Sequence, residues 1–132
     1  MANLIVKINK AFNDKDFEKV IHYCDMVLQE DSLNLNALLK KSDALAELGD
    51  FKQSIGCLRL ILNSDNKIIP AWVNLGYRYL DLKDYEKAIC CFDNVLDLNP
   101  NSIPAVAGKV QSYLKLNDYD SAKQYLNMLE SF

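Results

Sequence analysis

An aspartate followed by an aromatic residue recurs every 34 positions along the 132-residue chain, with no insertion or deletion between copies. The four pairs are Asp16-Phe17, Asp50-Phe51, Asp84-Tyr85 and Asp118-Tyr119. Apolar columns return with the same period, for example Leu4, Leu38, Trp72 and Val106. A fixed period of roughly 20–50 residues is typical of arrays of stacked supersecondary units. The period divides the chain into four repeats, at about 1–34, 35–68, 69–102 and 103–132.

Each repeat has the pattern of two short helices. In the third repeat, apolar residues recur every three or four positions from Trp72 to Leu82, and again from Tyr85 to Leu96. Lys83 lies between these stripes, at the position of Gly49 and Asn117, residue types that tolerate the left-handed conformation ending a helix. The aspartate that follows can cap the next helix. We therefore expect antiparallel helices of about 12–14 residues.

One such helical hairpin cannot bury both of its apolar stripes, whereas stacked neighbours bury them in a continuous core. The chain also contains only 4 Gly and 3 Pro, which favours helices with short connections. The sequence therefore predicts an all-α solenoid of four helical hairpins, forming a single domain over residues 1–132.

The charge distribution and hydropathy argue against nucleic-acid and membrane partners. The net charge is −3, and no repeat carries the cluster of Lys and Arg that neutralises phosphates. No apolar run approaches the roughly 20 residues that cross a bilayer. The first residues lack the pattern of a signal peptide, so we expect a cytoplasmic protein.

No set of residues points to catalysis, a cofactor or a metal. His22 is the only histidine and is expected on the surface. Cys24 lies in a core column, Cys90 is expected to be the most exposed thiol, and no Cys-x-x-Cys pair exists. No phosphate-binding glycine-rich loop is present. We therefore expect reduced thiols and no enzymatic activity.

The third repeat resembles the tetratricopeptide repeat. The match rests on residues at the family's spacing: Trp72, Leu75, Gly76, Tyr79, Ala88, Phe92 and Pro100. The other repeats keep this pattern in part. Lys7, Lys41 and Lys109 stand where the family usually has leucine, so we expect their stems to reach towards solvent or the helices to pack more loosely.

The resemblance implies a right-handed superhelix whose first helices line a concave groove that binds a peptide or helix of a partner protein. The partner-binding residues it implies are Val6, Asn9, Phe12, Asn13, Leu39, Lys40, Asp43, Glu47, Val73, Asn74, Tyr77, Leu80, Asp81 and Gln111. It also places Ile5, Asn36 and Gly108 on this face. Their mixture of apolar side chains and amides suits an extended segment or a helix.

Some members of this family hold the carboxylates of chaperone tails with a clamp of Lys, Asn and Arg. On repeats one to three the equivalent positions hold Ile5, Asn9, Lys40, Pro70 and Asn74, of which only Asn9 matches. Two carboxylates need several cations, and one lysine does not supply them. We therefore do not expect this clamp.

The last predicted helix, from Asp118 to Phe132, carries an apolar face with no further helix to cover it. The residues concerned are Tyr125, Met128, Leu129 and Phe132. Three explanations remain open: a longer protein, self-association through this end, or tolerance of a small exposed patch. The alternative function is therefore a self-assembly module that forms homo-oligomers through this helix.

Overall fold

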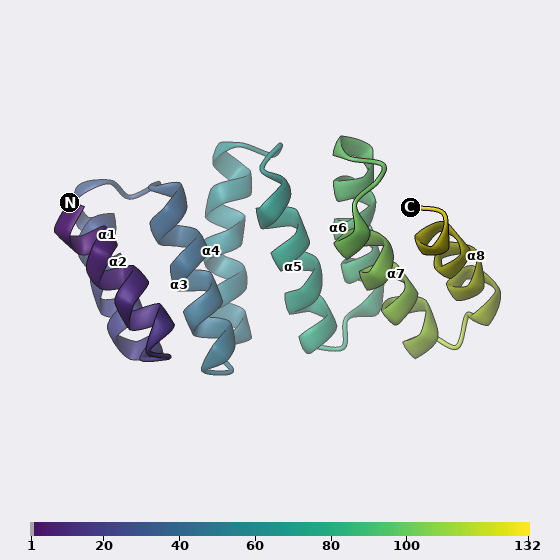
Figure 1. The fold of residues 1–132 in the computed structure, drawn as a ribbon, viewed down its shortest axis with the longest axis horizontal. Coiled ribbons are helices and arrows are strands. Elements are labelled where there is room, and N and C mark those ends of the chain that lie inside the picture. Colours follow the sequence, from purple (N-terminus) through teal and green to yellow (C-terminus); the bar gives the residue numbers. More distant parts are fainter. Residues whose placement is uncertain (1) are drawn as a thin grey trace. The chain divides into compact units, whose positions relative to one another are not determined.

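The computed structural model describes residues 2–132, which form eight α-helices and no strand (Figure 1). Consecutive helices pair as antiparallel hairpins, which confirms the all-α prediction and its four repeats. The helices are α1 (Ala2–Asn13), α2 (Phe17–Glu30), α3 (Leu35–Glu47), α4 (Phe51–Ser64), α5 (Ile69–Asp81), α6 (Tyr85–Leu98), α7 (Ile103–Lys115) and α8 (Tyr119–Glu130).

The recurring aspartate caps the second helix of every repeat, as predicted. The side chain of Asp84 accepts a hydrogen bond from the backbone N–H of Lys87 at 3.3 Å, and Asp16, Asp50 and Asp118 do the same at their helices. This bond satisfies one of the N–H groups that a helix start leaves without a partner.

The residue before each capping aspartate has the left-handed conformation. Its φ angle is +81° at Gly49 and between +58° and +61° at Lys15, Lys83 and Asn117. This conformation ends the first helix and reverses the chain, so the aspartate that follows can start the second. The left-handed conformation predicted from Gly49 and Asn117 is thus confirmed, and Lys15 and Lys83 adopt it as well.

The chain divides into two compact units, Met1–Asn66 and Lys67–Phe132. In the first unit, α2 packs against both α1 and α3, and α4 packs against α3. Its fully buried side chains include Val20, Cys24, Leu38 and Leu58. The core columns predicted from the 34-residue period therefore do form the interior of this unit.

In the second unit, α6 packs between α5 and α7, and α8 packs against α7. Phe92 of α6 is fully buried in this unit. Its ring occupies the space that a side chain would need at Gly76 of α5 and Gly108 of α7. These two glycines allow the neighbouring helices to approach the ring closely.

Candidate functional site

A cavity of about 260 Å³ opens between α1 and α3, the first helices of the two repeats in the first unit. We call the face formed by the first helices of a unit its first-helix face. Most of the lining surface is apolar, and one cation and several side-chain amides lie around it. The lining residues are Ile5, Ile8, Asn9, Val27, Asn34, Asn36, Ala37 and Lys40. Asn9 and Lys40 are among the predicted partner-binding residues, and Ile5 and Asn36 were placed on the same face.

Lys40 brings a positive charge to this cavity. Its Nζ lies 4.4 Å from the centroid of the Phe12 ring, and no carboxylate pairs with it among the residues that the structure describes. The Phe12 ring itself packs edge-on against Phe17 at 5.7 Å. The aromatic face holds the ammonium by a cation–π contact but leaves its charge uncompensated.

The amides around the cavity differ in their availability. The side chain of Asn34 caps α3 by accepting a hydrogen bond from the backbone N–H of Ala37 at 3.0 Å. Asn9 and Asn36 are exposed and have no hydrogen-bond partner within residues 2–132. Each of these two amides can both donate to and accept from a peptide backbone.

The other predicted residues of the first unit lie around this cavity without lining it. Val6 is 66% exposed, and Asn13 and Glu47 are exposed. Leu39 and Asp43 are half-buried.

In the second unit, two predicted residues already make contacts within the unit. The hydroxyl of Tyr77 on α5 donates to the backbone oxygen of Pro104 on α7 at 2.7 Å. Burial raises the pKa of Tyr77, so the hydroxyl stays a donor. The carboxylate of Asp81 accepts from Nε of Arg78 at 3.0 Å.

The remaining predicted residues of this unit are spread over its first-helix face. Val73, Asn74 and Leu80 are half-buried, and Gln111 is exposed. Gly108 is buried against Phe92. The prediction that it lies on the open groove face is therefore wrong. The close packing of α6 and α7 removes this position from solvent.

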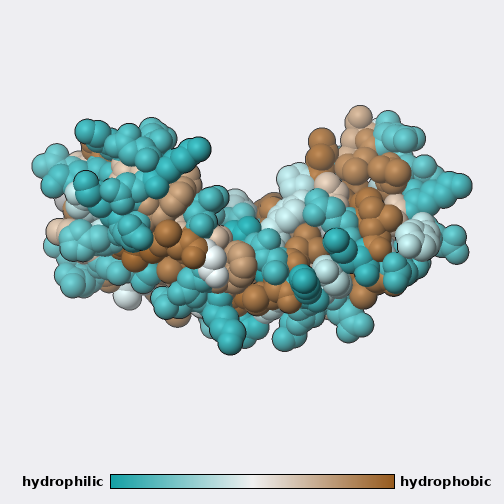
Figure 2. Space-filling model, turned by 90° about the horizontal axis from the view of Figure 1, so that it is seen from below, coloured by the Kyte–Doolittle hydropathy of each residue, from teal (hydrophilic) through white to brown (hydrophobic). Residues whose placement is uncertain are grey.

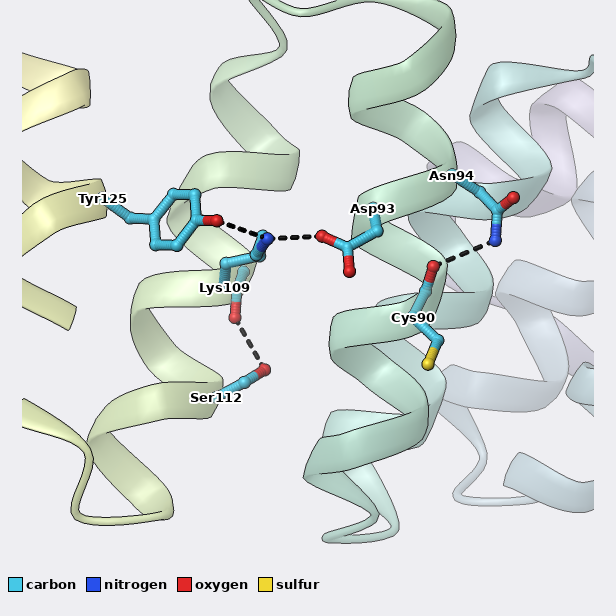
Figure 3. A network of polar contacts seen from close by, with 7 residues as sticks. Cys90, Asp93, Asn94, Lys109, Ser112 and Tyr125 are labelled. Carbon is cyan, nitrogen blue, oxygen red and sulfur yellow. Dashed lines mark hydrogen bonds and ion pairs between the residues drawn. The ribbon is translucent and has the colours of Figure 1, made fainter. Parts of the chain in front are cut away.

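Sequence reasoning missed a polar network that joins three helices of the second unit (Figure 3). Nζ of Lys109 on α7 donates to a carboxylate oxygen of Asp93 on α6 and to the hydroxyl of Tyr125 on α8, at 2.8 Å in the second case. The side chain of Lys109 is only 4% exposed. The expectation that this lysine reaches solvent is therefore wrong, because two partners satisfy its head group inside the packing.

The charge of Lys109 is stabilised where it lies. Burial alone would lower the pKa of Lys109, but the hydrogen bonds to Asp93 and Tyr125, together with the Asp93 charge, outweigh burial and raise it. The lysine therefore stays protonated at neutral pH and anchors both neighbouring helices.

The first unit contains the equivalent ion pair, 68 positions earlier. Nζ of Lys41 lies 2.7 Å from a carboxylate oxygen of Asp25, and the Lys41 side chain is 22% exposed. In both units a lysine at the family's leucine position pairs with an aspartate 16 residues earlier. This spacing, together with the departure from leucine, is the signal that could have revealed both pairs from sequence.

Cys24, Cys90 and His22 lie where the sequence predicts, and the burial of Cys57 and Cys91 comes from the structure. Cys90 and His22 are exposed, whereas Cys24, Cys57 and Cys91 are buried and reduced. Burial, with a smaller effect of the Asp25 charge, raises the pKa of Cys24 to about 12. Within residues 2–132, no three His, Cys, Asp or Glu side chains gather as metal ligands would. No helix in the same range has the length and apolar character needed to cross a membrane.

Solved structures show the same fold at low sequence identity. The structure of MamA is 22% identical, with a TM-score of 0.87 over 94% of this chain and 72% of that one. A tetratricopeptide repeat protein from Parabacteroides merdae is 21% identical, with a TM-score of 0.91 over 98% of this chain and 51% of its own. No curated protein matches the chain by sequence.

A third similar structure is the first tetratricopeptide repeat domain of Spaghetti (RPAP3) bound to the HSP90 peptide SRMEEVD. It is 21% identical, with a TM-score of 0.82 over 88% of this chain and 92% of that one. The family model described as tetratricopeptide repeat matches residues 79–131. The repeat period, the capped helical hairpins and these structural matches together show a fold of the tetratricopeptide repeat type, and residues 79–131 match the family model itself.

Proposed function

We propose that the chain is a protein-interaction scaffold, and that the cavity between α1 and α3 binds a segment of a partner protein. The observation that carries this proposal is the combination of an apolar cavity with the uncompensated charge of Lys40. An apolar depression with a few converging polar groups is the usual form of a binding site. The fold supports the proposal because a similar structure, that of Spaghetti (RPAP3), holds a peptide.

The chemistry of the lining indicates what such a segment would contain. Ile5, Ile8 and Val27 offer a place for one apolar side chain. Lys40 would attract a nearby carboxylate, and the free amides of Asn9 and Asn36 would bond to the peptide backbone. The preferred partner is therefore a segment with an apolar residue close to an aspartate or glutamate.

Panning a phage-displayed library of random dodecapeptides against the immobilised full chain would test this proposal. The enriched peptides should carry an acidic residue near an apolar one, and Lys40→Gln should weaken their binding by roughly tenfold. Lys52→Gln is the matched control, because Lys52 is exposed on α4 and does not line the cavity. Peptides that bind the Lys40 variant as well as the unchanged chain would refute the proposal.

Self-association is the second candidate function, favoured by the exposed apolar residues of α8 and its C-terminal end. Leu126 and Phe132 are each 47% exposed. Figure 2 shows hydrophobic residues towards the end of the second unit that carries α7 and α8, with hydrophilic residues at its outer edge. Met128 and Leu129 are half-buried, and Tyr125 is held by Lys109, so less apolar surface is available than predicted.

Two columns that are apolar in the preceding second helices become charged in α8. Lys123 occupies the column that holds isoleucine in the other repeats, at Ile21, Ile55 and Ile89. Glu130 occupies the column that holds leucine, at Leu28, Leu62 and Leu96. These charges weaken the case for a large apolar interface. Light scattering over a concentration series tests the idea: a mass that rises with concentration, and stops rising in Phe132→Glu, would support it, whereas a constant monomer mass would exclude it.

A further inference from the structure

We propose a second docking pocket, formed by α6, α7 and α8, that binds a basic residue and an adjacent apolar residue of a partner protein. The pocket has a volume of about 500 Å³. Its lining includes Asp93, Leu96 and Asp97 of α6, Lys109 of α7, and Tyr125 and Met128 of α8. None of its lining residues belongs to the cavity between α1 and α3, so the two sites are distinct.

The electrostatics of the pocket favour a cation. Lys109 is almost completely covered, and its ammonium is already bound to Asp93 and Tyr125. Asp93 is 52% exposed and only one of its oxygens bonds to Lys109, whereas the other takes no part in that bond (Figure 3). The second carboxylate oxygen of Asp93 can therefore accept a hydrogen bond from a basic group of a partner protein.

Asp97 adds a carboxylate that the fold itself does not use. It follows Asp93 by one helical turn on α6, so the two side chains lie on the same face. Asp97 is exposed and has no hydrogen bond or ion pair within the described part of the chain. The equivalent residue in the first unit is Gln29, although the ion pair Asp25–Lys41 is present there. The interhelical ion pair therefore does not require an acidic residue at this position.

Apolar groups beside the carboxylates complete the pocket. Leu96, Tyr125 and Met128 are all half-buried, so part of each remains available for contact. The Tyr125 ring is held in place by stacking on Tyr113, with the ring centroids 5.7 Å apart and the planes at 12°. The occupant is therefore a segment in which an arginine or lysine reaches Asp97 and the free oxygen of Asp93, while a neighbouring apolar side chain packs on these three residues.

Titration of the ¹⁵N-labelled full chain with acetyl-Leu-Ala-Ala-Arg-amide, followed by NMR, would test this pocket. We expect saturable shifts of amide signals in α6 and α8, and a decrease in affinity of roughly fivefold in Asp97→Asn. Asp120→Asn is the control, because it makes the same change in net charge at an exposed position on α8 that does not line the pocket. That variant should bind like the unchanged chain.

Acetyl-Leu-Ala-Ala-Glu-amide is the control for charge, and it should leave the same signals unshifted. Equal shifts with both peptides, or an equal loss of affinity in Asp97→Asn and Asp120→Asn, would overturn the proposal. Shifts of the arginine peptide confined to α1 and α3 would also overturn it. Failure of this test leaves the binding of acidic segments near Lys40 unaffected, because that cavity belongs to other helices and carries the opposite charge.

Discussion

The ring of Phe92 lies directly against the backbone of Gly108, and a Cβ atom at this glycine would overlap the ring. Phe92 is fully buried, so the ring has little room to move away. A Cβ atom on Gly76 of α5 would come within 2.5 Å of the same ring. The packing of α6 between α5 and α7 thus depends on the absence of a side chain at both glycines.

We predict that Gly108→Ala destabilises the chain by about 1–3 kcal/mol, because the extra methyl group overpacks the core around Phe92. Gly56→Ala is the matched control, since nothing lies within 4 Å of a Cβ atom built there. That change in the interior of α4 should stabilise the chain by about 0.5–1 kcal/mol. Urea unfolding of both variants measures the difference, and a Gly108→Ala variant as stable as Gly56→Ala would contradict the packing described.

The helices and their caps could be predicted because they depend on local chemistry that recurs every 34 residues. Phe92 lies two periods after Cys24, in the same core column, so its interior position also followed from the period. The burial of Gly108 did not, because a family pattern assigns a residue to a face of a helix but does not include the size of the side chain opposite. The chemistry of Lys109 was missed for a related reason: its partners lie on α6 and α8, and only the packing of three helices brings them together.

Removing the two partners of the Lys109–Asp93 pair should have unequal effects. Asp93→Ala leaves the ammonium of Lys109 buried without its carboxylate, which should cost about 1–3 kcal/mol. Lys109→Leu should change stability by less than about 1 kcal/mol, because Asp93 is half exposed and remains solvated. Leucine also suits the site, since Leu75 is 4% exposed at the equivalent position of the preceding repeat. Urea unfolding would test this, and a greater loss in Lys109→Leu than in Asp93→Ala would contradict it.

Stability should fall in alkaline solution because of the Cys24 thiol. Burial raises the pKa of this thiol from 9.0 to about 12, so above pH 9 the unfolded chain releases a proton that the folded chain keeps. The raised pKa favours folding fully below pH 9.0, and this advantage is lost as pH rises towards 12. In this range the free energy of unfolding should therefore decrease by an additional ~1.4 kcal/mol for each pH unit.

Cys24→Val should remove this contribution while filling a similar volume. Unfolding free energies at about pH 8 and about pH 10.5 would show a smaller difference in this variant than in the unchanged chain. Cys90→Ser is the control, since it removes a thiol that is exposed on α6 instead of a buried one. An identical pH dependence in Cys24→Val and Cys90→Ser would show that the Cys24 thiol is not the titrating group.

The hydroxyl of Tyr77 holds α5 to α7, so its loss should reduce stability even though the residue lies on the predicted partner-binding face. Tyr77→Phe removes the bond to the backbone oxygen of Pro104 and should cost about 0.5–1.5 kcal/mol. Tyr119→Phe is a suitable control, because its hydroxyl bonds to Asn117 at the surface and the side chain is 63% exposed. That variant should unfold at the same urea concentration as the unchanged chain.

The stability of Tyr77→Phe also decides which variants can test partner binding on the face formed by α5 and α7. Tyr77→Ala would remove both the hydrogen bond and the ring packed 5.1 Å from Phe92, so a loss of binding in that variant would include a loss of fold. Asn74 is half-buried and has no hydrogen-bond partner among residues 2–132, so Asn74→Ala tests the face with little structural cost. If Tyr77→Phe proves as stable as Tyr119→Phe, the hydroxyl does not hold the two helices together, and Tyr77→Phe can then serve as a direct probe of binding.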